Sequence, residues 1–139
     1  MIRKQSAFTL IELLVVIAII AILAVVVFVA LDPARRFAEA RNSRRWADVN
    51  NILTAVHECI VDNDGSLTTC GVGTTGTQVL GTGGLDISTQ MGPYLKSMPQ
   101  DPETGTAADT GYSLNVDTNN MVTITSDDAE LSETVQVSR

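Results

Sequence analysis

The sequence predicts an α+β fold in which a long N-terminal helix, transmembrane in its first half and amphipathic in its second, packs on a small antiparallel sheet. Three patterns carry this prediction: an unbroken apolar run that ends at Leu31, an apolar stripe with helical spacing after it, and alternating strand patterns beyond residue 110. The 139 residues suffice for one domain and an anchor.

The apolar run is a candidate membrane span. The nineteen consecutive residues from Leu13 to Leu31 lack any polar or charged side chain, and only Thr9 and Glu12 interrupt the run back to Phe8. A helix over this stretch would be about 36 Å long, and a hydrocarbon core is about 30 Å thick. A purely soluble protein is therefore excluded.

The net charge of −7 is concentrated late in the chain. Residues 59–139 carry eleven acids against Lys96 and Arg139. Because an acidic surface repels phosphate backbones, we do not expect nucleic acid as a partner of this part.

The N-terminus has three possible interpretations: a secretory signal peptide, an ordinary anchor, or a short leader followed by a retained anchor. Signal peptides have apolar cores of about 7–15 residues and a small-x-small cleavage site. This run is longer, and residues 28–33 offer no such site. We therefore do not expect removal of the whole segment.

Residues 4–12 favour a leader with a retained anchor. A short basic leader, the small residue Ala7 and then Phe-Thr-Leu-Ile-Glu over residues 8–12 resemble the cleavage and methylation signal of type IV pilins and type II secretion pseudopilins. The resemblance implies that prepilin peptidase cuts between Ala7 and Phe8 and methylates the new Phe8 amine. The family usually has Gly where this chain has Ala7.

The resemblance also implies an orientation. Two basic residues precede the apolar run and five Arg follow it closely, so the positive-inside rule alone would place the C-terminus in the cytoplasm. Pilins instead have a cytoplasmic leader and an exported head. We expect a single-pass precursor with a cytoplasmic N-terminus, and a mature form in an extracellular pilus or periplasmic pseudopilus.

Glu12 is the charged residue of the apolar helix. A carboxylate costs about 2.5–3.5 kcal/mol at the centre of a membrane helix, so an intramembrane acid indicates function. The resemblance implies that Glu12 pairs with the Phe8 amine of a neighbouring subunit and sets the filament register. The alternative is an acid that interacts with the helix dipole and snorkels to the interface. Ala18, Ala21 and Ala24 would permit close helix packing in the filament.

Asp32 and Pro33 predict a break, a kink or a restart of the helix, because Asp caps helices and Pro favours their first position. A simple punctuation at the membrane exit is the alternative. From Ala34 to about Val61 an apolar stripe recurs at helical spacing; its members are Trp46, Val49, Ile52, Leu53, Val56 and Ile60.

The five Arg of this helix lie within residues 35–45. We interpret them as a face that meets solvent or lipid headgroups, in preference to a nucleic-acid groove. In a filament they could instead face acids of neighbouring heads.

The helix is expected to end near residues 62–65, and the seven Gly and six Thr of residues 65–84 predict a long surface loop. Cys59 and Cys70 favour a disulfide that ties this loop to the helix, with two buried thiols as the alternative. The run His57-Glu58-Cys59 is not a thiol site, since adjacent helical residues point about 100° apart.

Residues 93–102 predict a short helical turn closed by prolines, and they resemble the segment that leads into the sheet of major pseudopilins. Alternation then predicts strands around residues 112–116 and 122–124, with a turn at 117–120 between them. Residues 134–139 predict a last strand. The expected segments are a leader (1–7), a transmembrane and filament-core helix (8–31), a stalk helix (32–62), a loop (63–92) and the sheet of the head (93–139).

Seven acids of the head raise a calcium hypothesis: Asp101, Glu103, Asp109, Asp117, Asp127, Asp128 and Glu130. None of their spacings matches an EF-hand. We therefore interpret them as solvated and expect no metal and no cofactor. With one His and no nucleophile motif, an enzyme is not expected.

The functional hypothesis is a type IV pilin that polymerises into a helical filament. The alternatives are a pseudopilin of a type II secretion system, and a membrane-anchored binding protein that never polymerises. The expected partners are further copies of the chain, prepilin peptidase, an inner-membrane assembly platform, and membrane lipid before assembly.

Overall fold

The computed structural model describes residues 8–73 and 75–139. The chain divides into two units, one ending at Arg36 and the other spanning Phe37–Arg139. The predicted leader at residues 1–7 lies outside the described residues. The predicted α+β class, a long N-terminal helix with a small antiparallel sheet, is confirmed.

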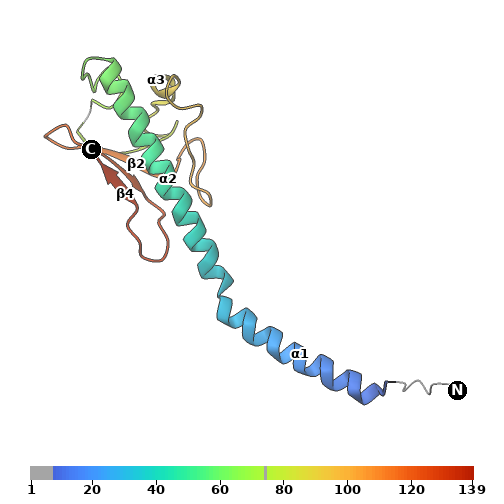
Figure 1. The fold of residues 1–139 in the computed structure, drawn as a ribbon. Coiled ribbons are helices and arrows are strands. Elements are labelled where there is room, and N and C mark those ends of the chain that lie inside the picture. The colour runs from blue at the N-terminus through green and yellow to red at the C-terminus, as the bar shows by residue number, and fades with distance from the viewer. Residues whose placement is uncertain (1–7, 74) are drawn as a thin grey trace. The chain divides into compact units, whose positions relative to one another are not determined.

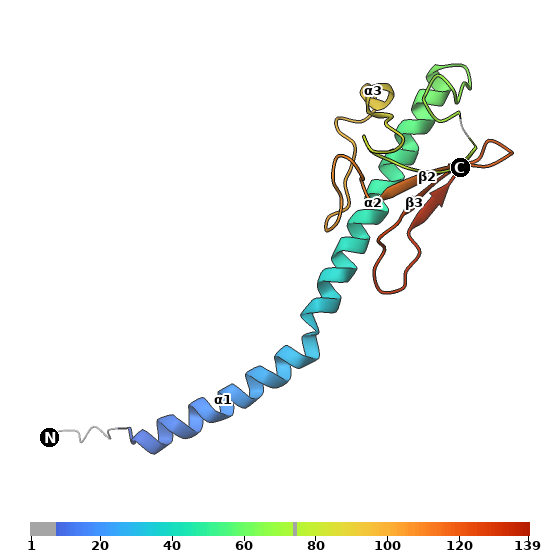
Figure 2. The same ribbon diagram turned by 180° about the vertical axis from the view of Figure 1, so that it is seen from behind.

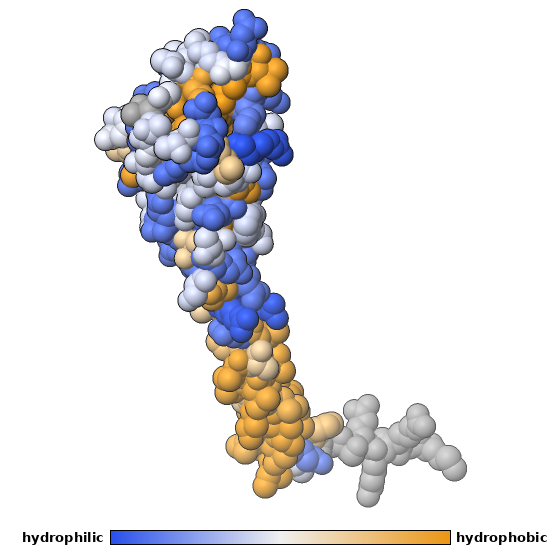
Figure 3. All heavy atoms as spheres, turned by 90° about the vertical axis from the view of Figure 1, so that its left-hand side faces the viewer, coloured by the Kyte–Doolittle hydropathy of each residue, from blue (hydrophilic) through white to orange (hydrophobic). Residues whose placement is uncertain are grey.

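Helix α1 spans Leu10–Leu31 and buries none of its residues. Its surface is almost entirely apolar (Figure 3). By length and composition, one helical stretch of the described chain, within Leu10–Asp62, is suited to cross a membrane. The 22 residues of α1 would span about 33 Å, which matches a hydrocarbon core.

The first helix ends at Asp32, whose backbone has the left-handed conformation with φ 37°. Helix α2, Pro33–Asp62, begins at the next residue. The Asp32 carboxylate accepts a hydrogen bond from the Arg35 N–H at 3.4 Å, and its carbonyl accepts one from the Arg36 N–H at 3.2 Å. Asp32 therefore acts as the cap of a restarted helix with Pro33 at its first position.

Helix α2 packs one face against the sheet of the head (Figures 1 and 2). The predicted stripe is buried from Val49 through Val56, and Ile60 packs against the same core. Trp46 departs from the prediction, because it is 39% exposed. The buried position at that level of the helix is Arg45 instead.

The sheet is an antiparallel meander in the order β1-β2-β3-β4. The predicted strands are present as β2 (Tyr112–Val116), β3 (Val122–Ser126) and β4 (Gln136–Ser138). Leu114 of β2 faces Ile124 of β3, and Ile124 faces Val137 of β4, so one row of apolar side chains crosses three strands. This row faces α2 as part of the core.

The prediction of a long surface loop over residues 65–84 is wrong in part. Strand β1, Gly76–Val79, pairs with β2, and the adjoining Leu80 is fully buried. Val72 is also buried in the core. Strand β1 forms with few apolar side chains because it is stabilised by hydrogen bonds to β2. Such pairing with a distant segment cannot be recognised from local composition.

The predicted helical turn is displaced toward the N-terminus. The short helix α3 spans Ser88–Met91, before Pro93, and Met91 is its buried side chain. The N–H groups of Tyr94 and Leu95 both bond to the Met91 carbonyl, so the turn closes just after Pro93. Residues 96–100 have no regular structure. Ile87 and Met91, at the two ends of this turn, are both buried in the core.

Candidate functional site

The start of α1 is organised around the carboxylate of Glu12. Thr9 donates to Glu12 Oε2 through its backbone N–H at 2.8 Å and through its hydroxyl at 2.7 Å. In return, the Glu12 N–H donates to Thr9 Oγ1 at 3.3 Å. This is a capping box, which satisfies donors that the first turn of a helix otherwise leaves open.

The predicted assembly residues of α1 lie on an open surface. Phe8 is 82% exposed, and Glu12 is exposed one turn later. Ala18, Ala21 and Ala24 are also exposed. Ala7, the residue before the predicted cleavage, lies outside the described residues. The surface of α1 is thus apolar, with one carboxylate near its first turn. The role of Phe8, Glu12 and the three alanines in filament packing stays a prediction.

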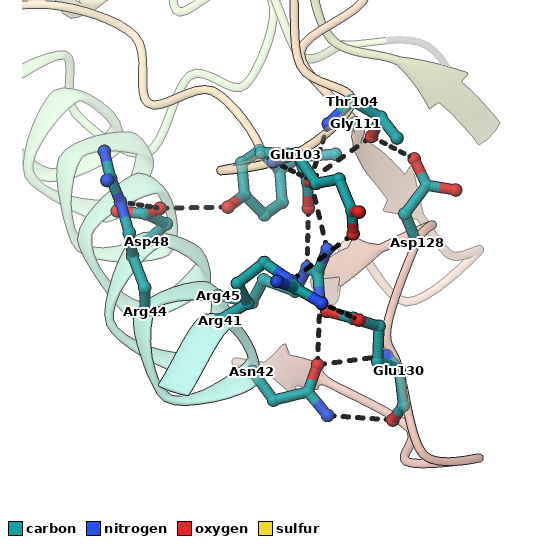
Figure 4. A network of polar contacts seen from close by, with 12 residues as sticks. Arg41, Asn42, Arg44, Arg45, Asp48, Glu103, Thr104, Gly111, Asp128 and Glu130 are labelled. Carbon is teal, nitrogen blue, oxygen red and sulfur yellow. Dashed lines mark hydrogen bonds and ion pairs between the residues drawn. The ribbon is translucent and has the colours of Figure 1, made fainter. Parts of the chain in front are cut away.

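The head contains a second polar constellation, an ion pair inside its core (Figure 4). Arg45 donates from Nε to Asp101 Oδ2 at 2.6 Å and from Nη2 to Asp101 Oδ1 at 3.1 Å. Both side chains are fully buried. This bidentate contact joins α2 to the segment before β2, far away in the sequence.

Glu130 extends the ion pair into a network. Its carboxylate accepts from Arg45 Nη1 at 2.6 Å and from Arg41 Nε at 2.7 Å, and Arg41 Nη2 also bonds to it. Asn42 donates to the Glu130 carbonyl at 2.8 Å and accepts from its N–H at 3.0 Å. Arg41 also lies 3.3 Å from Glu103. The loop after β3 is thereby tied to the same helix.

These contacts lower the pKa of both Asp101 and Glu130. Burial acts to raise the pKa of Asp101, but hydrogen bonds from Arg45 and from the N–H groups of Glu103 and Thr104 outweigh it and lower the pKa to about 2. Hydrogen bonds from Arg41 and Arg45 lower the pKa of Glu130 to about 2 as well. Both acids therefore stay ionised and paired over the physiological pH range.

Neighbouring residues complete the surroundings of Asp101. Its Oδ1 accepts from the backbone N–H of Glu103 at 2.9 Å and of Thr104 at 3.1 Å. Gly111 has φ +75°, and a Cβ there would lie 2.7 Å from Asp101 Cβ, so only glycine fits. Next to it, Tyr112 donates to Asp48 at 2.9 Å, and burial with this hydrogen bond raises the pKa of Tyr112. These contacts hold the start of β2 against α2.

Cys59 and Cys70 form a disulfide with a Cα–Cα distance of 5.9 Å. Both residues are buried in the core. The bond fixes the segment after α2 against the last turns of that helix. This is the disulfide between loop and helix that the sequence favoured.

Two interpretations of charged residues require correction. Asp101 is not solvated, since its side chain is fully buried against Arg45. Arg45 does not belong to a solvent- or headgroup-facing surface, because it is fully buried against Asp101, and Arg41, 31% exposed, pairs with Glu130 of its own head. The buried pair forms because several donors and acceptors satisfy each charge, which offsets part of the cost of removing it from water.

The sequence analysis named Glu12 but not its capping box with Thr9, and it missed the buried network of Asn42 and Arg45, although signals for both exist. Thr9 and Glu12 have the spacing of a capping box before an apolar run. Asn42 and Arg45 continue the three- and four-residue spacing of the buried part of the stripe, which begins at Val49, and both are buried. A polar residue in register with a core stripe predicts a buried network.

One comparison with known proteins identifies a feature of this chain. A family model described as the prokaryotic N-terminal methylation motif matches residues 2–28. Neither the curated proteins nor the solved structures gave a significant match.

Proposed function

Because the chain carries the signature of type IV pilins and pseudopilins, we propose that it is a structural subunit of a pilus-like filament. In this proposal prepilin peptidase cleaves between Ala7 and Phe8 and methylates the Phe8 amine. The precursor resides in the membrane through α1, and the mature subunit enters a filament through the same helix. The alternative filament is the pseudopilus of a type II secretion system, whose subunits would be cleaved, methylated and assembled in the same way.

The observation that carries the proposal is that α1, most of which lies within the matched methylation motif, has no buried residue. Burying one large aliphatic side chain is worth about 1.5–3 kcal/mol. A helix of 22 residues with no buried side chain therefore requires an apolar environment. Lipid supplies it before assembly, and the α1 helices of neighbouring subunits supply it afterwards.

Glu12 distinguishes this helix from an ordinary anchor. Both hydrogen bonds from Thr9 go to Oε2, and within the described residues no donor bonds to Oε1. We propose that Oε1 receives the methylated Phe8 amine of a neighbouring subunit. The ion pair would offset the cost of the carboxylate in an apolar interior and would fix the axial position of each added subunit.

Electron microscopy of sheared surface fractions, combined with mass spectrometry of the N-terminal peptide, tests the proposal. We expect filaments whose subunit begins at Phe8 with a methylated amine. A subunit that begins at Met1 in assembled material would contradict the processing step. Mature protein that stays in the membrane without any filament would instead support an anchored binding protein.

A further inference from the structure

We propose that a pocket beside α3 binds one sugar unit, a neutral ring that carries several hydroxyl groups. The pocket is lined by residues from three segments of the head, 81–88, 97–100 and 107–110. These segments lie outside α1, the helix on which the proposed function depends. The inference therefore goes beyond that function and does not require assembly.

The pocket is small. Its volume is about 210 Å³, below the range of about 300–1,000 Å³ that is usual for drug-sized ligands. It lies among the yellow to orange loops of the head in Figure 1. A pocket of this size suits a single ring, with the rest of a longer glycan outside it.

Part of the pocket wall is apolar. Ile87 is fully buried, Leu85 and Met98 are half-buried, and all three line the pocket. A sugar ring presents C–H groups on its two faces. Contact between these groups and the apolar side chains is favourable, because both surfaces leave water. The wall therefore offers a surface for the ring itself.

Two uncharged polar residues of the pocket have open hydrogen-bonding capacity. Ser97 and Gln100 line the pocket and are exposed. Within the described residues, neither side chain has a hydrogen-bond partner. A hydroxyl and a carboxamide can each donate and accept. The hydroxyl groups of a sugar also do both, so they suit these two side chains.

Among the described residues that line the pocket, Asp86 alone is charged. Its Oδ1 accepts a hydrogen bond from the Ser88 N–H at 3.0 Å. Hydrogen bonds from Ser88 lower the pKa of Asp86, so the carboxylate is ionised at neutral pH. Hydrogen bonds from hydroxyl groups to a carboxylate are about twice as strong as those between neutral groups. Asp86 is therefore the strongest acceptor that the pocket offers to a sugar hydroxyl.

The charge of the pocket distinguishes between classes of ligand. An anion would be repelled by Asp86 and would find no Lys or Arg among the described lining residues. A cation would meet one exposed carboxylate, and exposed ion pairs contribute little. A neutral molecule with several hydroxyl groups uses the carboxylate, the two uncharged polar side chains and the apolar wall together.

Hydrogen bonds between loops hold one side of the pocket in place. Thr82 donates from its N–H to the Ala107 carbonyl at 2.9 Å, and Gly83 donates to the Ala108 carbonyl at 2.9 Å. A Cβ on Gly81 would overlap that Ala108 carbonyl, so the two loops are in direct contact. A wall that is already ordered reduces the entropy that a ligand loses on binding.

Saturation-transfer NMR on the full-length chain tests the site, in a zwitterionic detergent that has no sugar headgroup. The probes are the methyl glycosides of glucose, galactose, mannose and N-acetylglucosamine at millimolar concentration. We expect at least one of them to receive saturation at its ring C–H protons. Tetrahydropyran-2-methanol, a ring with a single hydroxyl, and the methyl glycoside of glucuronate, an anion, should each bind at least about tenfold more weakly.

Substitutions locate the binding in this pocket. Asp86→Asn keeps the size of the side chain and an acceptor for the Ser88 N–H, but it removes the charge, so the dissociation constant of the bound glycoside should rise about tenfold or more. Gln100→Ala should raise it several-fold. The matched control is Asp64→Asn, which makes the same change at an exposed position outside the pocket. Asp64 has φ 54°, a conformation that Asn also adopts.

Thermal unfolding of each variant should match that of the wild type, which separates loss of the site from misfolding. Weaker binding in Asp86→Asn and unchanged binding in Asp64→Asn supports the site. No saturation of any glycoside, equal binding in these two variants, or equal binding of the ring with one hydroxyl overturns it. Filaments are examined separately by electron microscopy, so their absence would contradict the proposed function and leave the sugar site standing.

Discussion

The guanidinium of Arg45 and the carboxylate of Asp101 meet in a bidentate ion pair whose side chains are both fully buried. Arg45 belongs to α2 and Asp101 to the segment before β2, so the pair joins the helix of the head to the chain that leads into its sheet. Removing the charge of one partner of such a pair leaves the other charge uncompensated in the core.

We expect Asp101→Asn to lower the free energy of unfolding by about 3–5 kcal/mol, because Arg45 would remain buried without its counter-charge. Chemical denaturation of the detergent-solubilised chain, followed by the fluorescence of Trp46, measures this change. Arg44→Ala is the control, since Arg44 is 65% exposed and a surface change should stay within about 0.5 kcal/mol. Equal effects of the two substitutions would show that the buried pair adds no stability.

Acid should destabilise the head at unusually low pH. The pKa values of Asp101 and Glu130 lie near 2, below their ordinary values of 3.8 and 4.5. Their contribution to stability is therefore complete above about pH 4.5 and is lost as pH falls toward 2. Denaturation midpoints between pH 7 and pH 2 measure the profile, and Asp101→Asn should flatten its acid limb. A loss of stability that is already complete at pH 4 would contradict these shifts.

Peptide mapping of the purified protein without reductant should find Cys59 joined to Cys70, as in the structure. Replacement of both cysteines by Ser should cost about 3 kcal/mol in the chain-entropy model. Thermal unfolding with and without reductant measures the difference. Reductant should not affect the doubly substituted chain. Free thiols in the purified wild type would show that the disulfide does not contribute to its stability.

Glu12→Val should abolish or misregister filaments while leaving the amount of membrane protein unchanged or higher. The substitution removes an intramembrane charge, so insertion becomes easier. It also removes the proposed partner of the Phe8 amine, whereas Ala18, Ala21 and Ala24 still permit helix packing. Comparison of membrane and sheared surface fractions measures both effects.

Thr9→Ala is the matched control for Glu12→Val, because it removes the hydroxyl of the capping box and keeps the carboxylate. A capping loss of about 0.5–2 kcal/mol should leave filaments in place. Normal filaments from Glu12→Val would reduce Glu12 to an interfacial acid. Loss of the protein itself would assign it a role in folding.

Local patterns were sufficient for the elements with strong periodicity. The apolar run predicted α1, and the alternation at Tyr112, Leu114 and Val116 predicted β2. Both depend on residues close together in the sequence, whose spacing reports directly which side chains need an apolar surface. The capping box of Thr9 and Glu12 could have been predicted in the same way, because its partners are three residues apart.

The rest depended on contacts between distant segments. Strand β1 forms from a Gly- and Thr-rich stretch because it pairs with β2. Arg45, which by residue type belongs on the surface, is buried because it pairs with Asp101 and Glu130. These acids lie 56 and 85 residues later in the sequence. The sequence by itself determined which segments are helical, extended and apolar, since local spacing encodes these properties. Only the tertiary structure decided which charges are internal, because a charge can leave water only where folding supplies the opposite charge and enough hydrogen bonds.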